Sequence, residues 1–120
     1  MAQSIQGYLH GLPSEQKRIA AALMALIRQA APSASAAVTG DLIVFDLKGP
    51  VCFIRSEPAC VVFGFCRGAE LDSAKGRLEA DGAGAARIRL VAEGDVRKGP
   101  FLVWIKEAFR LNVSRPLPKR

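Results

Sequence analysis

Hydrophobic residues recur at helical spacing near both ends of the chain. From about Ser14 to Ala31 and from about Pro100 to Leu111 they fall on one side of a helix. Ser14 is expected to cap the first helix, and Pro32 ends it because a proline ring cannot continue the hydrogen-bond ladder. The buried stripes predicted for the two helices are Ile19, Leu23, Leu26, Ile27 and Ala30, and Phe101, Trp104, Ile105, Ala108 and Phe109.

Between the helices, short apolar segments predict strands. Three of them, at residues 42–47, 51–56 and 60–67, are separated by turns of a few residues, so we expect an antiparallel meander. A fourth strand is expected at residues 87–91, where arginines alternate with aliphatic residues in a pattern typical of an exposed or edge position. The small-residue stretch 33–40 is predicted to be a linker, and the polar stretch 68–84 a long loop or a short turn of helix.

These elements predict a single domain of the α+β class. An antiparallel sheet of four strands, or slightly more, packs against an N-terminal and a C-terminal helix. We expect the domain to span residues 1–114, with a basic tail at 115–120. Half of the residues are hydrophobic and 23% are charged, which allows a buried core and excludes a disordered chain. No membrane-length apolar run and no signal-peptide pattern are visible, so a cytoplasmic protein without a membrane partner is expected.

The predicted sheet is apolar on both faces, because side chains alternate across a strand. We expect Phe53, Phe63 and Phe65 on the face that the helices cover. Two helices can hardly cover both faces, so the second face needs a second copy of the chain, the 68–84 segment or a small ligand. Self-association or self-covering is expected ahead of a ligand. The residues predicted for this ligand or dimer face are Cys52, Ile54, Val62 and Cys66.

Charge adds two weak binding signals. Half of the net charge of +6 comes from Arg115, Lys119 and Arg120, and such a tail permits weak nucleic-acid association. The other basic residues are spread along the chain and nearly all aromatic residues fall on core stripes, so nucleic-acid binding is not favoured. The glycine-containing stretch 82–87 suggests a weak anion site, although a turn with solvated arginines is the favoured alternative. The basic residues around this stretch are Lys75, Arg77, Arg87 and Arg89.

No catalytic or metal-binding pattern accompanies this fold. The chain has one histidine, His10, so no nucleophile can be paired with a histidine base, and we expect no enzyme activity. Cys52, Cys60 and Cys66 all lie in apolar segments, and we interpret them as buried free thiols. A zinc site would need closer ligand spacing or histidine partners, so no metal or other cofactor is predicted.

Several motifs resemble those of the YdhG-like family of domains of unknown function, which is related to the frataxin-like group. The resemblance extends over nearly the whole chain and implies a compact α+β domain with an antiparallel sheet against helices. Residues 36–42 depart from the family pattern, which has an acidic residue, a Trp-Gly or similar pair and a proline there. The matching motifs are Tyr8-Leu9, Leu12-Pro13-Ser14-Glu15-Gln16, Ala30-Ala31-Pro32, Lys48-Gly49-Pro50, Phe63-Gly64-Phe65, Arg67-Gly68-Ala69-Glu70-Leu71 and Lys106-Glu107-Ala108-Phe109-Arg110-Leu111-Asn112.

The resemblance also implies iron delivery as an alternative function, because one type of family member has been linked to that role. Frataxin-type iron sites use several carboxylates on a helix and an adjacent strand. Here each long helix carries one carboxylate, Glu15 or Glu107. Four further acidic residues, Glu70, Asp72, Glu79 and Asp81, lie in the 68–84 segment. Lys75 and Arg77 alternate with them there, so a solvated loop is the favoured interpretation.

Overall fold

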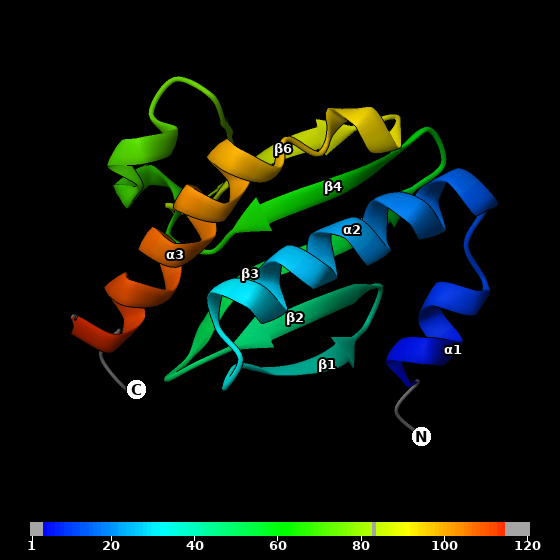
Figure 1. Cartoon of the computed structure of the whole chain (residues 1–120), viewed down its shortest axis with the longest axis horizontal. Coiled ribbons are helices and arrows are strands. Elements are labelled where there is room, and N and C mark those ends of the chain that lie inside the picture. The colour runs from blue at the N-terminus through cyan, green and yellow to red at the C-terminus, as the bar shows by residue number, and fades with distance from the viewer. Residues whose placement is uncertain (1–3, 83, 115–120) are drawn as a thin grey trace.

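The computed structural model describes residues 4–82 and 84–114, and it confirms the α+β class (Figure 1). Its helices are α1 (Ile5–His10), α2 (Ser14–Ala30) and α3 (Lys98–Ser114), with short 3-10 turns η1 (Gly68–Glu70), η2 (Asp72–Ala74) and η3 (Glu93–Asp95). Its strands are β1 (Ser35–Thr39), β2 (Leu42–Asp46), β3 (Pro50–Glu57), β4 (Cys60–Phe65), β5 (Glu79–Ala80) and β6 (Ala86–Leu90). They form one antiparallel sheet in the order β1-β2-β3-β4-β6-β5.

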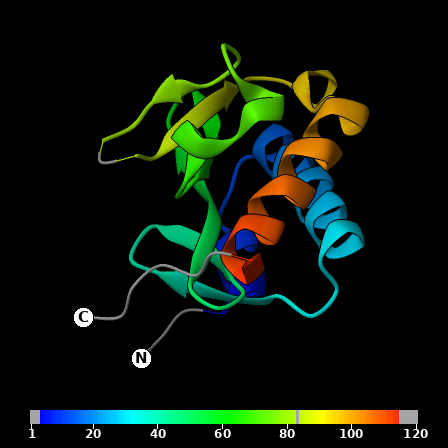
Figure 2. The ribbon, with the colours of Figure 1, turned by 90° about the vertical axis from the view of Figure 1, so that its left-hand side faces the viewer.

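The two long helices and the four expected strands are all present, with bounds within a few residues of those predicted. The helices α2 and α3 lie on one side of the sheet (Figure 2). They bury their apolar stripes against the strands in one large core that includes Ile19, Ile54, Phe63 and Ile105. No helix in the described part of the chain is long and apolar enough to cross a membrane. The basic tail predicted at 115–120 lies outside the described residues.

Two local predictions were wrong, and a third holds only in part. The stretch 33–40 is no linker, because residues Ser35–Thr39 form β1 and pair with β2. The exposed or edge position predicted for the strand at 87–91 holds only in part, since the two-residue β5 pairs with Ala86 and Arg87 of β6 but with none of Ile88–Leu90. Ser14 is the first residue of α2 and makes no capping hydrogen bond; Pro13 occupies the cap position. The first two outcomes depend on which strands pair with each other, and the residue pattern of a single strand does not predict its neighbours in the sheet.

Asn112 joins the end of α3 to the turn between β2 and β3. Its side-chain amide nitrogen donates hydrogen bonds to the carbonyl oxygens of Leu47 at 3.3 Å, Gly49 at 3.1 Å and Pro50 at 3.3 Å. Its amide oxygen accepts a hydrogen bond from the Arg67 guanidinium at 3.4 Å. The side chain is 1% exposed. Because a buried polar side chain needs hydrogen-bond partners, these contacts hold the end of α3 against the turn.

We therefore expect Asn112→Ala to lower the free energy of unfolding by about 1 to 3 kcal/mol, because it removes the hydrogen bonds by which a buried side chain joins α3 to the turn. Chemical denaturation followed by tryptophan fluorescence measures the loss. Val113→Ala is the matched control, since Val113 is the next residue of α3 and is 49% exposed. Equal losses in the two variants would contradict this role for Asn112.

Glu107 on α3 holds the turn η2. Its carboxylate accepts hydrogen bonds from the backbone N–H groups of Asp72 at 3.1 Å and Ser73 at 3.0 Å, and from the Ser73 hydroxyl. The indole N–H of Trp104 donates to the Ser73 carbonyl oxygen at 3.1 Å. Burial alone would raise the pKa of Glu107. The hydrogen bonds that its carboxylate accepts from Ser73 and Asp72 outweigh this effect and lower the pKa below its ordinary value.

A lowered pKa in the folded state means that ionised Glu107 stabilises the fold above its unfolded-state pKa, about 4.3. This contribution is lost as the pH falls through the lower folded-state pKa. We therefore expect the wild-type chain to be more stable than Glu107→Gln at neutral pH, with the gap closing on acidification. Urea denaturation at a series of pH values measures it. Ser73→Ala removes one hydrogen-bond donor to Glu107, so the difference in stability between the chain with Glu107 and its Glu107→Gln variant should be smaller in that background. A stability difference that does not change with pH would contradict this role of Glu107.

Candidate functional site

The candidate site is the face of the sheet that no described helix covers, and we call it the outer face (Figure 2). A small apolar cluster lies on it, separate from the large core under the helices. In this cluster Phe53, Cys60 and Val62 are buried, and Leu42, Val44 and Cys66 pack against them half-buried. Strand pairing adds Arg55, Glu57, Arg87 and Arg89 to the same face.

The residues predicted for a ligand or dimer face do not share one face. Cys52 and Ile54 lie opposite Phe65 and Phe63 in the β3–β4 pairing and are buried in the large core. Val62 and Cys66 belong to the outer cluster instead. Alternation within one strand shows which of its residues share a face. It does not show which face of the next strand lies on the same side of the sheet, because a shift of one residue in the pairing would reverse that assignment. The grouping of the four residues was therefore wrong.

Phe53 also lies on the outer face, not on the helix-covered face with the other two phenylalanines. Its partner across the strands is Gly64, and its ring lies over that glycine. A Cβ atom at Gly64 would be 2.1 Å from the ring carbon Cζ of Phe53. The guanidinium carbon of Arg55 is 5.9 Å from the ring centroid, which suits a cation–π contact. Phe53 is only 9% exposed as a result.

We expect Gly64→Ala to push the Phe53 ring off the sheet toward solvent and to lower the free energy of unfolding by about 1 to 3 kcal/mol. Chemical denaturation measures this loss. Phe53→Leu removes the ring atoms that the new methyl group meets, so Gly64→Ala should be much milder in that background. An equal loss of unfolding free energy in the two backgrounds would contradict a close contact between the Phe53 ring and Gly64.

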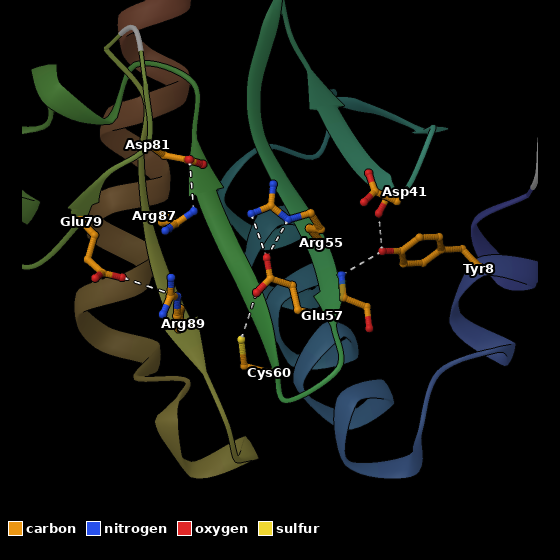
Figure 3. A network of polar contacts seen from close by, with 10 residues as sticks. Tyr8, Asp41, Arg55, Glu57, Cys60, Glu79, Asp81, Arg87 and Arg89 are labelled. Atoms are coloured by element: carbon orange, nitrogen blue, oxygen red, sulfur yellow. Dashed lines mark hydrogen bonds and ion pairs between the residues drawn. The ribbon is translucent and has the colours of Figure 1, made fainter.

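The three arginines of the outer face each meet a carboxylate (Figure 3). The nitrogen–oxygen distances are 3.1 Å for Arg55–Glu57, 3.2 Å for Arg87–Asp81 and 3.8 Å for Arg89–Glu79. Arg55 and Arg89 lie on either side of Val62 in the strand pairing, and Val62 is 0% exposed. Charged side chains of the chain itself therefore shield part of this apolar surface.

The paired charges on the outer face cancel, whereas those on the helices do not. Its three arginines are matched by three carboxylates, so the paired groups add no net charge. By contrast, α2 and α3 each carry three basic residues and one acidic residue, which makes the helix side of the molecule positive. The three ion pairs of the outer face thus add no positive charge to this side of a strongly basic chain, and Asp46 beside Cys66 is a further acidic group there.

The basic residues predicted for a weak anion site are not gathered around one point. Arg87 and Arg89 lie on β6 and face carboxylates, while Lys75 and Arg77 lie exposed in the segment after η2. The Nε atom of Arg87 is buried and has no hydrogen-bond partner among the described residues. A cavity of about 170 Å³ beside this segment has Lys75 as its one charged lining residue and is otherwise lined by glycine, alanine and leucine.

The three cysteines are free thiols, with Cys52 and Cys60 buried and Cys66 half-buried. Burial raises the pKa of each thiol, and the Glu57 carboxylate raises that of Cys60 further, as Asp46 does for Cys66. Thiols with a raised pKa are mostly protonated at neutral pH and therefore react slowly as nucleophiles. Within residues 4–82 and 84–114, no group of three or more histidine, cysteine or acidic side chains is placed to hold a metal ion.

Sequence reasoning missed the part that Leu42, Val44 and Phe53 play on the outer face. The usable signal was Gly64 in the middle of an otherwise apolar strand, since a buried glycine there often marks the close approach of a neighbouring group. Comparison with protein-family models, with curated proteins and with solved structures finds no match to this chain. Membership of the YdhG-like family therefore stays a prediction from the sequence motifs.

Proposed function

We propose that this chain is a non-enzymatic domain that self-associates through the outer face of its sheet. The observation that supports this is a partly apolar surface, whose arginines are all paired with carboxylates, on a chain whose net charge is +6. Two copies of a basic chain repel each other wherever positive surfaces meet. The outer face avoids that repulsion, because its arginines and carboxylates balance.

A symmetric dimer requires a surface that is complementary to itself. The outer face has arginines and carboxylates side by side, from Arg55 and Glu57 at one end to Arg89 and Glu79 at the other. A second copy related by a twofold axis can therefore place carboxylates against guanidinium groups. Leu42 and Val44, which are half-buried, would supply the apolar area that such a contact removes from water.

A small ligand on the outer face has less support than a second copy. A hollow of about 600 Å³ lies on the helix side, between α2, Glu93 of η3 and Lys98 at the start of α3. Another of about 280 Å³ lies between α1 and α2. Ligand sites are typically concave, and neither of these hollows is formed by residues of the outer face.

Val44→Lys tests the proposed contact, because it puts a charge into the half-buried apolar part of the outer face. We expect the dissociation constant of the dimer to rise at least about tenfold. Sedimentation equilibrium over a wide concentration range measures it. Val103→Lys is the matched control, since Val103 is 54% exposed on α3, and it should leave the dissociation constant unchanged.

A second variant guards against a folding defect in Val44→Lys. Arg89 is exposed, so Arg89→Glu should fold normally while it makes the outer face acidic and repulsive to itself. Circular dichroism confirms folding in each case. A wild-type chain that stays monomeric throughout, or a dimer that neither variant weakens, would overturn the proposed contact.

Iron delivery, nucleic-acid association and a cytoplasmic location are further proposals for this chain. Iron delivery and a cytoplasmic location follow only from the family resemblance and the composition, and weak nucleic-acid association follows only from the basic tail. No observation on the described residues favours iron or nucleic acid over self-association. Their readouts are separate, since iron binding is measured as heat on titration with ferrous ion and nucleic-acid binding as a salt-dependent affinity.

A further inference from the structure

The strand β1 forms one edge of the sheet, and no strand in the described part of the chain pairs with its outward side. It pairs with β2 alone, and its five residues are mostly exposed. None of the described elements lies beyond it on that side, and α1 is placed past the Thr39 end of the strand, not along it (Figure 1). An edge strand presents backbone N–H and C=O groups that can pair with another strand.

The turn between β1 and β2 shows which backbone groups point outward. Thr39 pairs with Leu42 across the two-residue turn Gly40-Asp41, so these two residues form the hydrogen-bonded pair that closes the hairpin. Hydrogen-bonded and non-hydrogen-bonded pairs alternate along an antiparallel ladder. The N–H and C=O groups of Ala36 and Val38 therefore point away from β2, at the free edge.

The two edges of the sheet differ in their protection against another strand. The opposite edge, β5, is only two residues long, and its Glu79 carboxylate lies 3.8 Å from Arg89. Short length and charged side chains are the usual devices that keep edge strands apart. β1 has neither of these protective features. It contains no proline or lysine, and no charged residue occurs between Arg28 and Asp41.

The side chains of β1 are also compatible with a second copy of the same strand. Antiparallel pairing of the outward groups, with the whole strand in register, centres the contact on Ala37. Ala36 then lies opposite Val38 of the other copy, and Ser35 opposite Thr39. Small, uncharged residues face one another at every position, and the outward groups form about four hydrogen bonds. A basic chain offers few other places where two copies can meet without repulsion.

We propose that β1 pairs with β1 of a second copy, antiparallel and centred on Ala37, and joins the two sheets edge to edge. This contact uses backbone groups at the sheet edge, whereas the contact proposed above uses side chains of the outer face. Each can therefore exist without the other. Where both form, the joined sheets present two outer faces side by side, and the assembly is larger than a dimer.

Cysteine cross-linking tests the register. Ala37 would lie opposite itself in a non-hydrogen-bonded pair, whose Cα atoms are about 4.5 Å apart, a separation that suits a disulfide. In a Cys66→Ser background, we expect Ala37→Cys to form a covalent dimer rapidly under mild oxidation. Ser35→Cys and Thr39→Cys should each cross-link poorly alone but efficiently when mixed. Cross-linking of Ala37→Cys no faster than that of Val103→Cys on α3 would overturn the proposal.

Ala36→Pro tests the backbone contact without the oxidant. It removes one outward N–H group that the fold itself does not use, whereas Ala36→Ser keeps that group. We expect the proline variant to lose the edge contact and the serine variant to keep it, by sedimentation equilibrium in the Arg89→Glu background, because Val44 lies directly opposite Ala37 whereas Arg89 lies on β6. Loss of association in Arg89→Glu alone, with no cross-link through Ala37→Cys, would support the outer-face contact and overturn the edge contact. Rapid cross-linking of Ala37→Cys with no effect of Arg89→Glu on association would support the edge contact and overturn the outer-face contact.

Discussion

The pairing of β3 with β4 is the contact on which the rest of this structure depends. It places Ile54 beside Phe63 under the helices and, on the other side, lays Phe53 over Gly64. Because side chains alternate along both strands, a shift of one residue would bury the outer face and expose the core. The large core, the small outer cluster and the place of Arg55 on the outer face follow from this register, and the β4–β6 pairing then adds Arg87 and Arg89 to that face.

Charge then divides the molecule into two sides. The guanidinium groups of β3 and β6 are matched by carboxylates on the outer face, whereas α2 and α3 keep an excess of positive charge. Matched pairs of this kind contribute little stability where solvent reaches them. Their consequence is mainly for association, since they leave the sheet as the side of this basic chain that another copy can approach. The proposed contacts at the outer face and at β1 both follow from this distribution.

The stretch before β2 shows how a feature that is weak in sequence becomes informative in three dimensions. Ser35–Thr39 contains no aromatic residue and one β-branched aliphatic residue, so its composition is typical of a connection. It becomes a strand because the Gly40-Asp41 turn, with Gly40 at φ 61°, folds it back onto β2. The same stretch departs from the motif pattern of the family that the chain resembles. Its lack of charge matters only because the fold puts it at an edge.

The sequence by itself determined the two long helices, the four main strands and the α+β class, because hydrophobic periodicity and the prolines and glycines at their ends are local properties. It also determined that both faces of the sheet carry apolar residues. The tertiary structure alone decided that Cys52 and Ile54 lie under the helices, that Phe53 lies outside, and that β1 is the open edge. Those facts depend on which residues of neighbouring strands lie opposite one another, and such pairing is set by packing between segments that are distant in the chain.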